Sequence, residues 1–146
     1  MYVDVSGFES EIESAGSGVV ASFPIVLGMT RIAPGGILVV EEPELHLEPN
    51  RQMALVALLC EHAIRRKFTL VMTTHSDFII RRTLGLVARH KIKSSNVGLQ
   101  FFDRKAEQFT TIRSLDISDE GEAEQPLFDE AVQALVKDYS DVISTK

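Results

Sequence analysis

The chain has 146 residues, of which 45% are hydrophobic and 25% are charged, and its formal net charge at pH 7 is -6. This length allows one domain with a real core but not two, and the acidic balance argues against nucleic-acid binding through phosphate contacts by this chain alone. A single cysteine, Cys60, excludes an internal disulfide framework and fits a reducing compartment. Without a bilayer-spanning apolar run or a signal-peptide pattern at Met1, we expect a cytoplasmic protein with no membrane partner.

The first part of the chain contains a loop of small residues ahead of an apolar segment. Residues 2–5 alternate like a short strand, and residues 14–18 read Ser-Ala-Gly-Ser-Gly before the apolar stretch at 19–29. We predict a glycine-rich turn that feeds a helix, which Pro24 kinks or interrupts. Hydroxyl groups, flexible backbone N–H groups and a helix N-terminus suit a phosphate, although the plainer alternative is a flexible turn before a core helix.

Two apolar segments predict buried parallel strands that deliver polar groups at their C-terminal ends. Residues 37–40 run into Glu41 and Glu42, and residues 69–73 lead to His75. Open α/β sheets bind their ligands at the carboxyl ends of the strands. Two carboxylates and a histidine delivered there suit a magnesium-nucleotide site.

Helical patterns separate and follow these strands. The apolar stripe of residues 51–66 predicts a helix covered on much of its circumference. Ser76 is a predicted N-cap for a second helix over residues 78–89. The order strand, helix, strand, helix predicts an α/β fold with a parallel sheet.

The pattern changes in the last third of the chain. Residues 97–102 and 109–112 are predicted strands joined by a polar turn. Residues 116–130 contain seven acids and no bases, which predicts a solvated loop, and Pro126 is expected to start a short terminal helix.

The carboxylates and the histidine admit more than one interpretation. In a nucleotide hydrolase the first acid, Glu41, would hold Mg²⁺ and the second, Glu42, would polarise the attacking water, whereas both could instead be surface acids that cap a helix. A lone histidine is more often structural than catalytic, but the position of His75 at a strand end would allow it to donate a hydrogen bond to a γ-phosphate. A metal-dependent hydrolase using Glu41, Glu42 and Glu44 directly is disfavoured, because proline interrupts the acids and no histidine cluster accompanies them.

Taken together, these segments resemble the C-terminal half of an ABC-type ATPase head. The branch is the one often labelled predicted AAA ATPases, related to the overcoming-lysogenization-defect and chromosome-maintenance type ATPases. The resemblance covers roughly residues 3–82 and rests on four segments in the family's order. These are a signature loop at 14–18, a Walker B strand at 37–42, a D-loop at 45–48 and a switch histidine at His75.

The resemblance implies a role for each matching residue. Glu41 is similar to the magnesium-associated acid, Glu42 to the acid that activates water, and His75 to the switch histidine at the γ-phosphate. Glu48 stands where the family's D-loop has aspartate, which is a departure from the pattern. The residues implied to bind the nucleotide cofactor lie in the signature loop and the D-loop: Ser14, Gly16, Ser17, Gly18 and Glu48.

The Walker A pattern G-x-x-x-x-G-K-[ST] does not occur in these 146 residues. The resemblance therefore implies that ATP and Mg²⁺ bind only with a Walker A-containing lobe or companion subunit, and that the isolated chain is inactive. It also implies a homo- or heterodimer of heads, with nucleic acid reached only through the assembled complex. We expect residues 1–146 to form a single domain, with the signature-to-switch region at 1–93 and the C-terminal strands, acidic loop and helix at 94–146. The alternative is a non-catalytic, degenerate interaction module with the ATPase fold.

Overall fold

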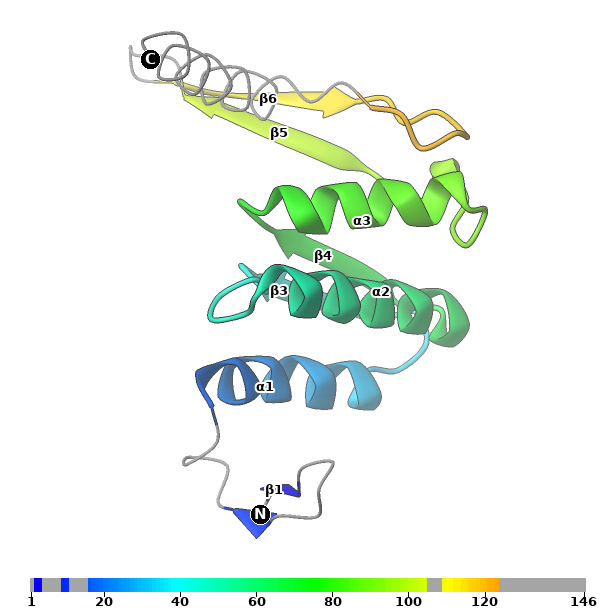
Figure 1. Cartoon of the computed structure of the whole chain (residues 1–146). Coiled ribbons are helices and arrows are strands. Elements are labelled where there is room, and N and C mark those ends of the chain that lie inside the picture. The colour runs from blue at the N-terminus through cyan, green and yellow to red at the C-terminus, as the bar shows by residue number, and fades with distance from the viewer. Residues whose placement is uncertain (1, 4–8, 11–15, 105–108, 124–146) are drawn as a thin grey trace, which may run out of the picture.

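The computed structural model describes residues 2–3, 9–10, 16–104 and 109–123 (Figure 1). Its helices and strands alternate through the middle of the chain, so the predicted α/β class is confirmed. The helices are α1 (Ser17–Arg31), α2 (Pro49–Arg66), α3 (Asp77–Ala88) and the short 3-10 helix η2 (Ser94–Asn96). The strands are β1 (Tyr2–Val3), β2 (Glu9–Ser10), β3 (Ile37–Glu41), β4 (Thr69–Thr73), β5 (Leu99–Arg104) and β6 (Thr110–Leu115).

The two central strands, β3 and β4, are parallel, as the sequence predicts. Their register runs from Ile37 opposite Thr69 to Glu41 opposite Thr73. The other described pairs, β1 with β2 and β5 with β6, are antiparallel. A parallel pair needs a crossover connection, and α2 provides it.

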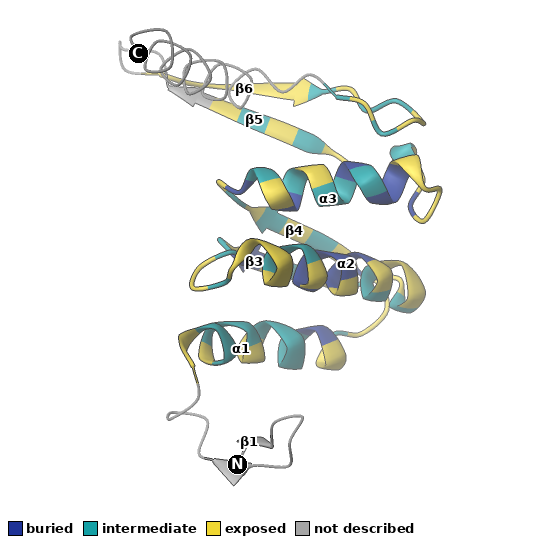
Figure 2. Ribbon diagram, in the orientation of Figure 1, coloured by how far each residue is buried: buried dark blue, intermediate teal, exposed yellow. Residues whose placement is uncertain are grey.

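The core lies between this parallel pair and the helices. Leu38, Leu70 and Met72 occupy alternate strand positions and pack against the helices. Helix α2 is central to the packing, since Val56 and Leu59 on it are fully buried. Figure 2 shows buried residues concentrated on α2 and α3, with few on α1.

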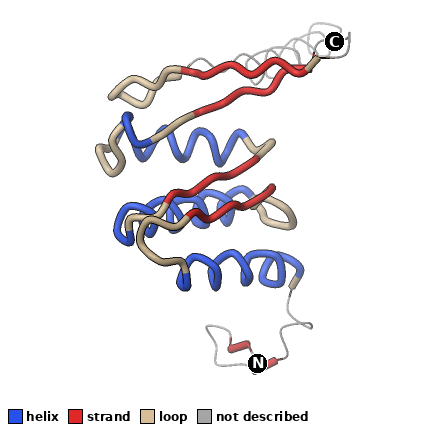
Figure 3. The backbone as a smooth tube through the Cα atoms, turned by 180° about the vertical axis from the view of Figure 1, so that it is seen from behind, coloured by secondary structure: helices blue, strands red, loops and turns tan. Residues whose placement is uncertain are grey.

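The opposite face of the β3–β4 pair is uncovered by the described residues. Ile37, Val39 and Val71 are 63%, 61% and 45% exposed, and we call these three residues the open sheet face. Figure 3, seen from behind, shows both strands in front of the helices with no helix over them. Parallel sheets are normally covered on both faces, so this apolar surface suits an interface.

Some predicted boundaries and features differ from the structure. Helix α1 continues through Pro24, so the alternative of an interrupted helix is wrong. A proline removes only one helical hydrogen bond, and the packing of α1 against α2 and β3 supports the segment around it. Helix α2 begins at Pro49, two residues before the predicted start, because proline is well suited to the first helical turn.

The C-terminal strands are displaced by a few residues from their predicted positions, to Leu99–Arg104 and Thr110–Leu115. The acidic segment is described as far as residue 123, and its acids at 116, 119, 120 and 122 are exposed, as predicted. Gly121 nevertheless lies against the carbonyl oxygen of Leu84 on α3, so this turn packs on the domain. The predicted helix at Pro126 lies outside the described residues.

Among the described residues, none of the helices combines the length and the apolar character that crossing a bilayer requires.

Candidate functional site

The described residues that the sequence predicts for the site lie along one edge of the molecule. The C-terminal ends of β3 and β4 and the N-terminal ends of α1, α2 and α3 all lie at the left in Figure 1. Helix N-termini present backbone N–H groups without intrahelical partners and the positive end of the helix dipole. An edge of this kind is electrostatically suited to an anion such as a phosphate.

Glu41 and Glu42 are consecutive, but the structure gives them different surroundings. Glu41 is the last residue of β3 and is exposed, and it lies on the same side of the strand as the open sheet face. The Glu42 backbone N–H donates to the carbonyl oxygen of Thr73 at 2.9 Å, which extends the ladder by one step. The φ angle of Glu42 is +44°, so the chain turns out of the strand at this residue.

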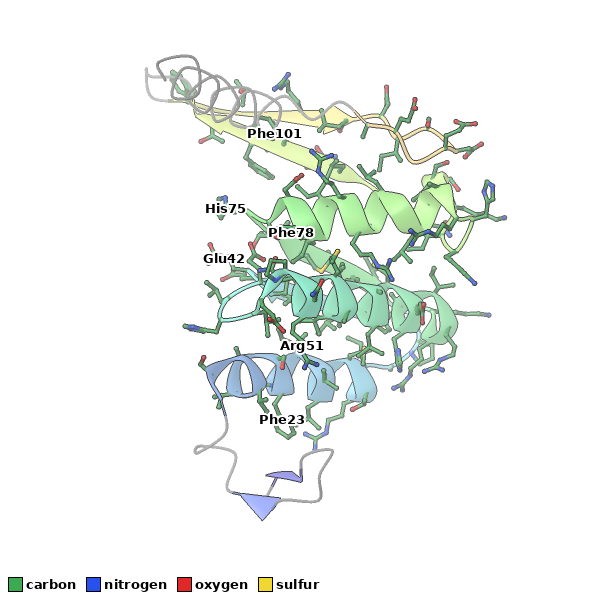
Figure 4. All side chains as sticks on the ribbon, in the orientation of Figure 1. Phe23, Glu42, Arg51, His75, Phe78 and Phe101 are labelled. Carbon is green, nitrogen blue, oxygen red and sulfur yellow. The ribbon has the colours of Figure 1, made fainter. Side chains whose placement is uncertain are left out.

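That turn brings Glu42 to His75. The Nε2 atom of His75 lies 3.7 Å from Oε1 of Glu42, and both side chains are visible at the same edge in Figure 4. The His75 side chain is 90% exposed and that of Glu42 is 43% exposed. The two predicted catalytic residues are therefore adjacent and accessible to a ligand.

Glu44 and Gln52, for which the sequence predicts no role at His75, hold the backbone at and next to this histidine. Oε1 of Glu44 accepts a hydrogen bond from the His75 backbone N–H at 2.7 Å. The Ser76 hydroxyl donates to Oε1 of Gln52 at 2.5 Å and accepts from the backbone N–H of Ile79 at 3.4 Å, which confirms Ser76 as the N-cap of α3. Gln52 is one of several polar residues at the start of α2, so nothing in the sequence distinguishes it.

The signature-like loop lies at the start of α1. Gly16 is the N-cap residue, and its carbonyl oxygen accepts hydrogen bonds from the backbone N–H groups of Val19 at 2.8 Å and Val20 at 3.3 Å. Ser17 and Gly18 are the first two residues of α1. Gly18 lies against the carbonyl oxygen of His46, so the first turn of α1 meets the segment that follows the acids. Ser14 lies outside the described residues.

Glu48 is positioned at the N-terminus of α2. It is the N-cap residue, but its side chain makes no capping hydrogen bond and instead lies 3.5 Å from the guanidinium group of the exposed Arg51. Within residues 16–104, no hydrogen bond or ion pair joins Glu48 or the start of α1 to Glu42 or His75. The structure therefore brings the two predicted catalytic residues together, while the described residues predicted to bind the cofactor make no hydrogen bond or ion pair to them.

The donor atoms at this edge fit Mg²⁺ that arrives with a nucleotide. Mg²⁺ is usually held by one or two carboxylates together with phosphate oxygens and waters, and the exposed carboxylate of Glu41 can serve as such a ligand. No group of three or more acids, histidines or cysteines in the described part of the chain could hold a metal by itself. Glu44 already accepts a hydrogen bond from the His75 backbone. The alternative of a metal-dependent hydrolase that uses Glu41, Glu42 and Glu44 directly therefore loses support.

Two hollows adjoin the parallel strands. A groove of about 350 Å³ runs between α1 and β3 and includes Glu41, Glu42 and Pro43 in its walls. A larger hollow of about 480 Å³ lies between α2, β4 and α3 and reaches Leu99 of β5. Its walls are mainly apolar and include neither Glu42 nor His75, so it is separate from the candidate site.

A comparison with protein families matches residues 6–81 to the family described as "AAA domain, putative AbiEii toxin, Type IV TA system". The match covers slightly more than half of the chain. The chain belongs to this family of AAA domains. All eight residues predicted for the site, from Ser14 to His75, lie inside the matched region. A comparison with curated proteins found no match.

Membership in this AAA family places the chain among P-loop NTPase-type domains, which bind ATP with Mg²⁺. It agrees with the parallel strand pair and with polar residues at the strand ends. The recognition of an ATPase-type domain from the sequence is confirmed at this level.

Proposed function

We propose that this AAA domain is the C-terminal lobe of an ABC-type ATPase head and that it supplies the hydrolytic residues of the site. The observation that carries the proposal is the approach of His75 Nε2 to within 3.7 Å of Glu42 Oε1 at the carboxyl edge of two parallel strands. An exposed carboxylate and an exposed imidazole so close together have no evident structural purpose. They suit a water molecule and a phosphate that bind beside them, each within reach of one of the two side chains.

Each residue then has a separate task. Glu42 orients the attacking water and accepts its proton, a contribution that is typically 10²- to 10⁴-fold in rate. His75 donates a hydrogen bond to the γ-phosphate, and the carboxylate of Glu41 binds Mg²⁺. When bound, the metal would neutralise charge on the phosphate oxygens.

The rest of the triphosphate site would come from a Walker A-containing lobe or companion subunit. Three features of the structure support this partner: the open sheet face, the edge of β4 that no described strand pairs with, and the apolar hollow beside it. Parallel strands with apolar side chains on both faces are typical of the centre of a sheet. The partner would cover the open sheet face, and two complete heads would then dimerise around ATP through the start of α1 and Glu48.

Calorimetric titration of Mg-ATP tests this function. We expect the chain alone to bind more weakly than ~1 mM, about -4 kcal/mol, and to bind at least ~10-fold more tightly once a Walker A-containing lobe is added. His75→Ala should remove most of that gain. A degenerate interaction module would bind the lobe but show no gain in ATP affinity, and tight His75-dependent binding by the chain alone would overturn the need for a partner.

A further inference from the structure

The segment that follows β3 folds back toward the end of β4 through two overlapping turns. The Leu45 backbone N–H donates to the Glu42 carbonyl oxygen at 3.1 Å, and the Leu47 N–H donates to the Glu44 carbonyl oxygen at 3.0 Å. Together with the positive φ of Glu42, these turns direct the Glu44 side chain toward the neighbouring strand end. There its Oε1 atom accepts the hydrogen bond from the backbone N–H of His75 at 2.7 Å.

The other oxygen of Glu44 is in a different situation. Oε2 is buried and has no hydrogen-bond partner within the described part of the chain. Removing a carboxylate oxygen from water without a partner costs free energy, so a glutamate at this position is a poor choice for stability alone. Among the residues that the structure describes, only His75 makes a hydrogen bond to this carboxylate, and the bond is of the short, charge-assisted kind.

A second connection holds the residue after His75. Ser76 donates to Oε1 of Gln52 at 2.5 Å, and Nε2 of Gln52 donates to the carbonyl oxygen of Leu47 at 2.8 Å. Besides the approach of Glu42 to His75, the segment 42–47 is therefore joined to the segment 75–76 by two hydrogen-bonded connections. The first is made by Glu44 and the second by Gln52.

We propose that Glu44 is a positioning residue, which holds the backbone of His75 so that the imidazole stays beside Glu42. This proposal rests on the proposed function, which assigns His75 to the γ-phosphate, and adds a residue that positions it. Because the His75 side chain is 90% exposed, packing does little to fix it. Its location is set instead by the backbone, and therefore by the acceptor on Glu44.

The test is amide hydrogen exchange, followed by NMR on the whole 146-residue chain without nucleotide. In Glu44→Ala we expect the His75 amide to exchange about tenfold faster, while amides in α2 and α3 keep their rates. Glu44→Gln retains an acceptor oxygen and should restore the His75 rate to within about threefold of the original. Glu61→Ala, at an exposed position of α2, is the matched control and should leave His75 unchanged.

Three results would overturn the proposal. One is an unchanged His75 rate in Glu44→Ala, and another is equal acceleration throughout α2 and α3, which would indicate general loss of stability. The third is a failure of Glu44→Gln to restore protection. Because no nucleotide is present, the outcome is independent of ATP binding, and failure of the titration described above would not change it.

Discussion

Gly18 lies so close to the carbonyl oxygen of His46 that a β-carbon built on Gly18 would be 2.9 Å from that oxygen. It would also lie 3.0 Å from Cδ2 of Leu47. The start of α1 and the segment after the acids are therefore packed through a glycine. These are the two segments that the proposed function assigns to contacts between heads, so their packing bears directly on the shape of that surface.

Gly18→Ala should destabilise the chain by about 1–2 kcal/mol, because the new methyl group meets a backbone oxygen that cannot move freely. In an unobstructed helix the same change would stabilise by up to about 1 kcal/mol. Urea denaturation of Gly18→Ala and of Gly16→Ala measures the loss of stability in each variant. No atom lies within 4 Å of a β-carbon at Gly16, so we expect a loss below about 1 kcal/mol there. Equal losses in the two variants would contradict the close contact.

Glu42→Gln tests the proposed catalytic role of Glu42 in a complex with a Walker A-containing lobe. ATP turnover should fall by about 10²- to 10⁴-fold, since the amide cannot accept a proton from water. The nucleotide-bound dimer should persist in gel filtration, because binding is retained while release by hydrolysis is lost. Glu61→Gln provides a control at an exposed acid on α2. Turnover within threefold of the original in Glu42→Gln would favour the non-catalytic module.

Val39→Lys tests the open sheet face. Val39 is 61% exposed, so the stability of the isolated chain should change by less than about 1 kcal/mol. Its affinity for a Walker A-containing lobe should fall at least ~10-fold, because a lysine ammonium would be buried without a partner. Leu58→Lys, on α2 at 38% exposure, is the control for added charge. If both variants bind the lobe equally well, the partner does not cover this face.

Leu59→Ala tests the position of the core. Leu59 is fully buried, whereas its neighbour Leu58 is 38% exposed. We expect Leu59→Ala to lower the free energy of unfolding by about 2–5 kcal/mol, through lost burial and the cavity left behind. Leu58→Ala should cost less than about 1 kcal/mol. Denaturant unfolding of both variants measures the difference, and similar losses would mean that α2 is rotated from the orientation described.

Ionisation of the Cys60 thiol is expected to lower the free energy of unfolding at high pH. Burial, followed by the negative charge of Glu61, raises the pKa of the Cys60 thiol from 9.0 to about 11. A raised pKa in the folded state stabilises the fold fully below pH 9, and this contribution is lost as the pH rises toward 11. The loss across this window should approach about 3 kcal/mol.

The measurement is urea unfolding of the original chain and of Cys60→Ala between pH 7 and 11. The two stability curves should run parallel up to about pH 9 and then converge or cross, since only the original chain loses the thiol contribution. Curves that remain parallel to pH 11 would show that Cys60 titrates normally in the folded chain.

Local sequence patterns were sufficient to predict the central elements. The bounds of β4 match the prediction because a short run of apolar and β-branched residues lies between Lys67 and His75, and the end of α2 at Arg66 matches as well. Ser76 was predicted as an N-cap because the cap depends on residues within one turn. Glu41, Glu42 and His75 were expected at one site because the carboxyl ends of adjacent parallel strands share an edge, and the structure adds that Glu42 is the acid beside His75.

Contacts between distant segments were decided only by the tertiary structure. Glu44 and His75 are 31 residues apart, and Gln52 and Ser76 are 24 apart, so no local pattern marks these hydrogen bonds. The exposure of the open sheet face was also decided by the tertiary structure. The apolar residues of β3 and β4 predict burial on both sides of the strands, while the position of the helices decides which side is covered. Periodicity along a chain specifies which residues share a face, whereas what lies against that face depends on how the elements pack in three dimensions.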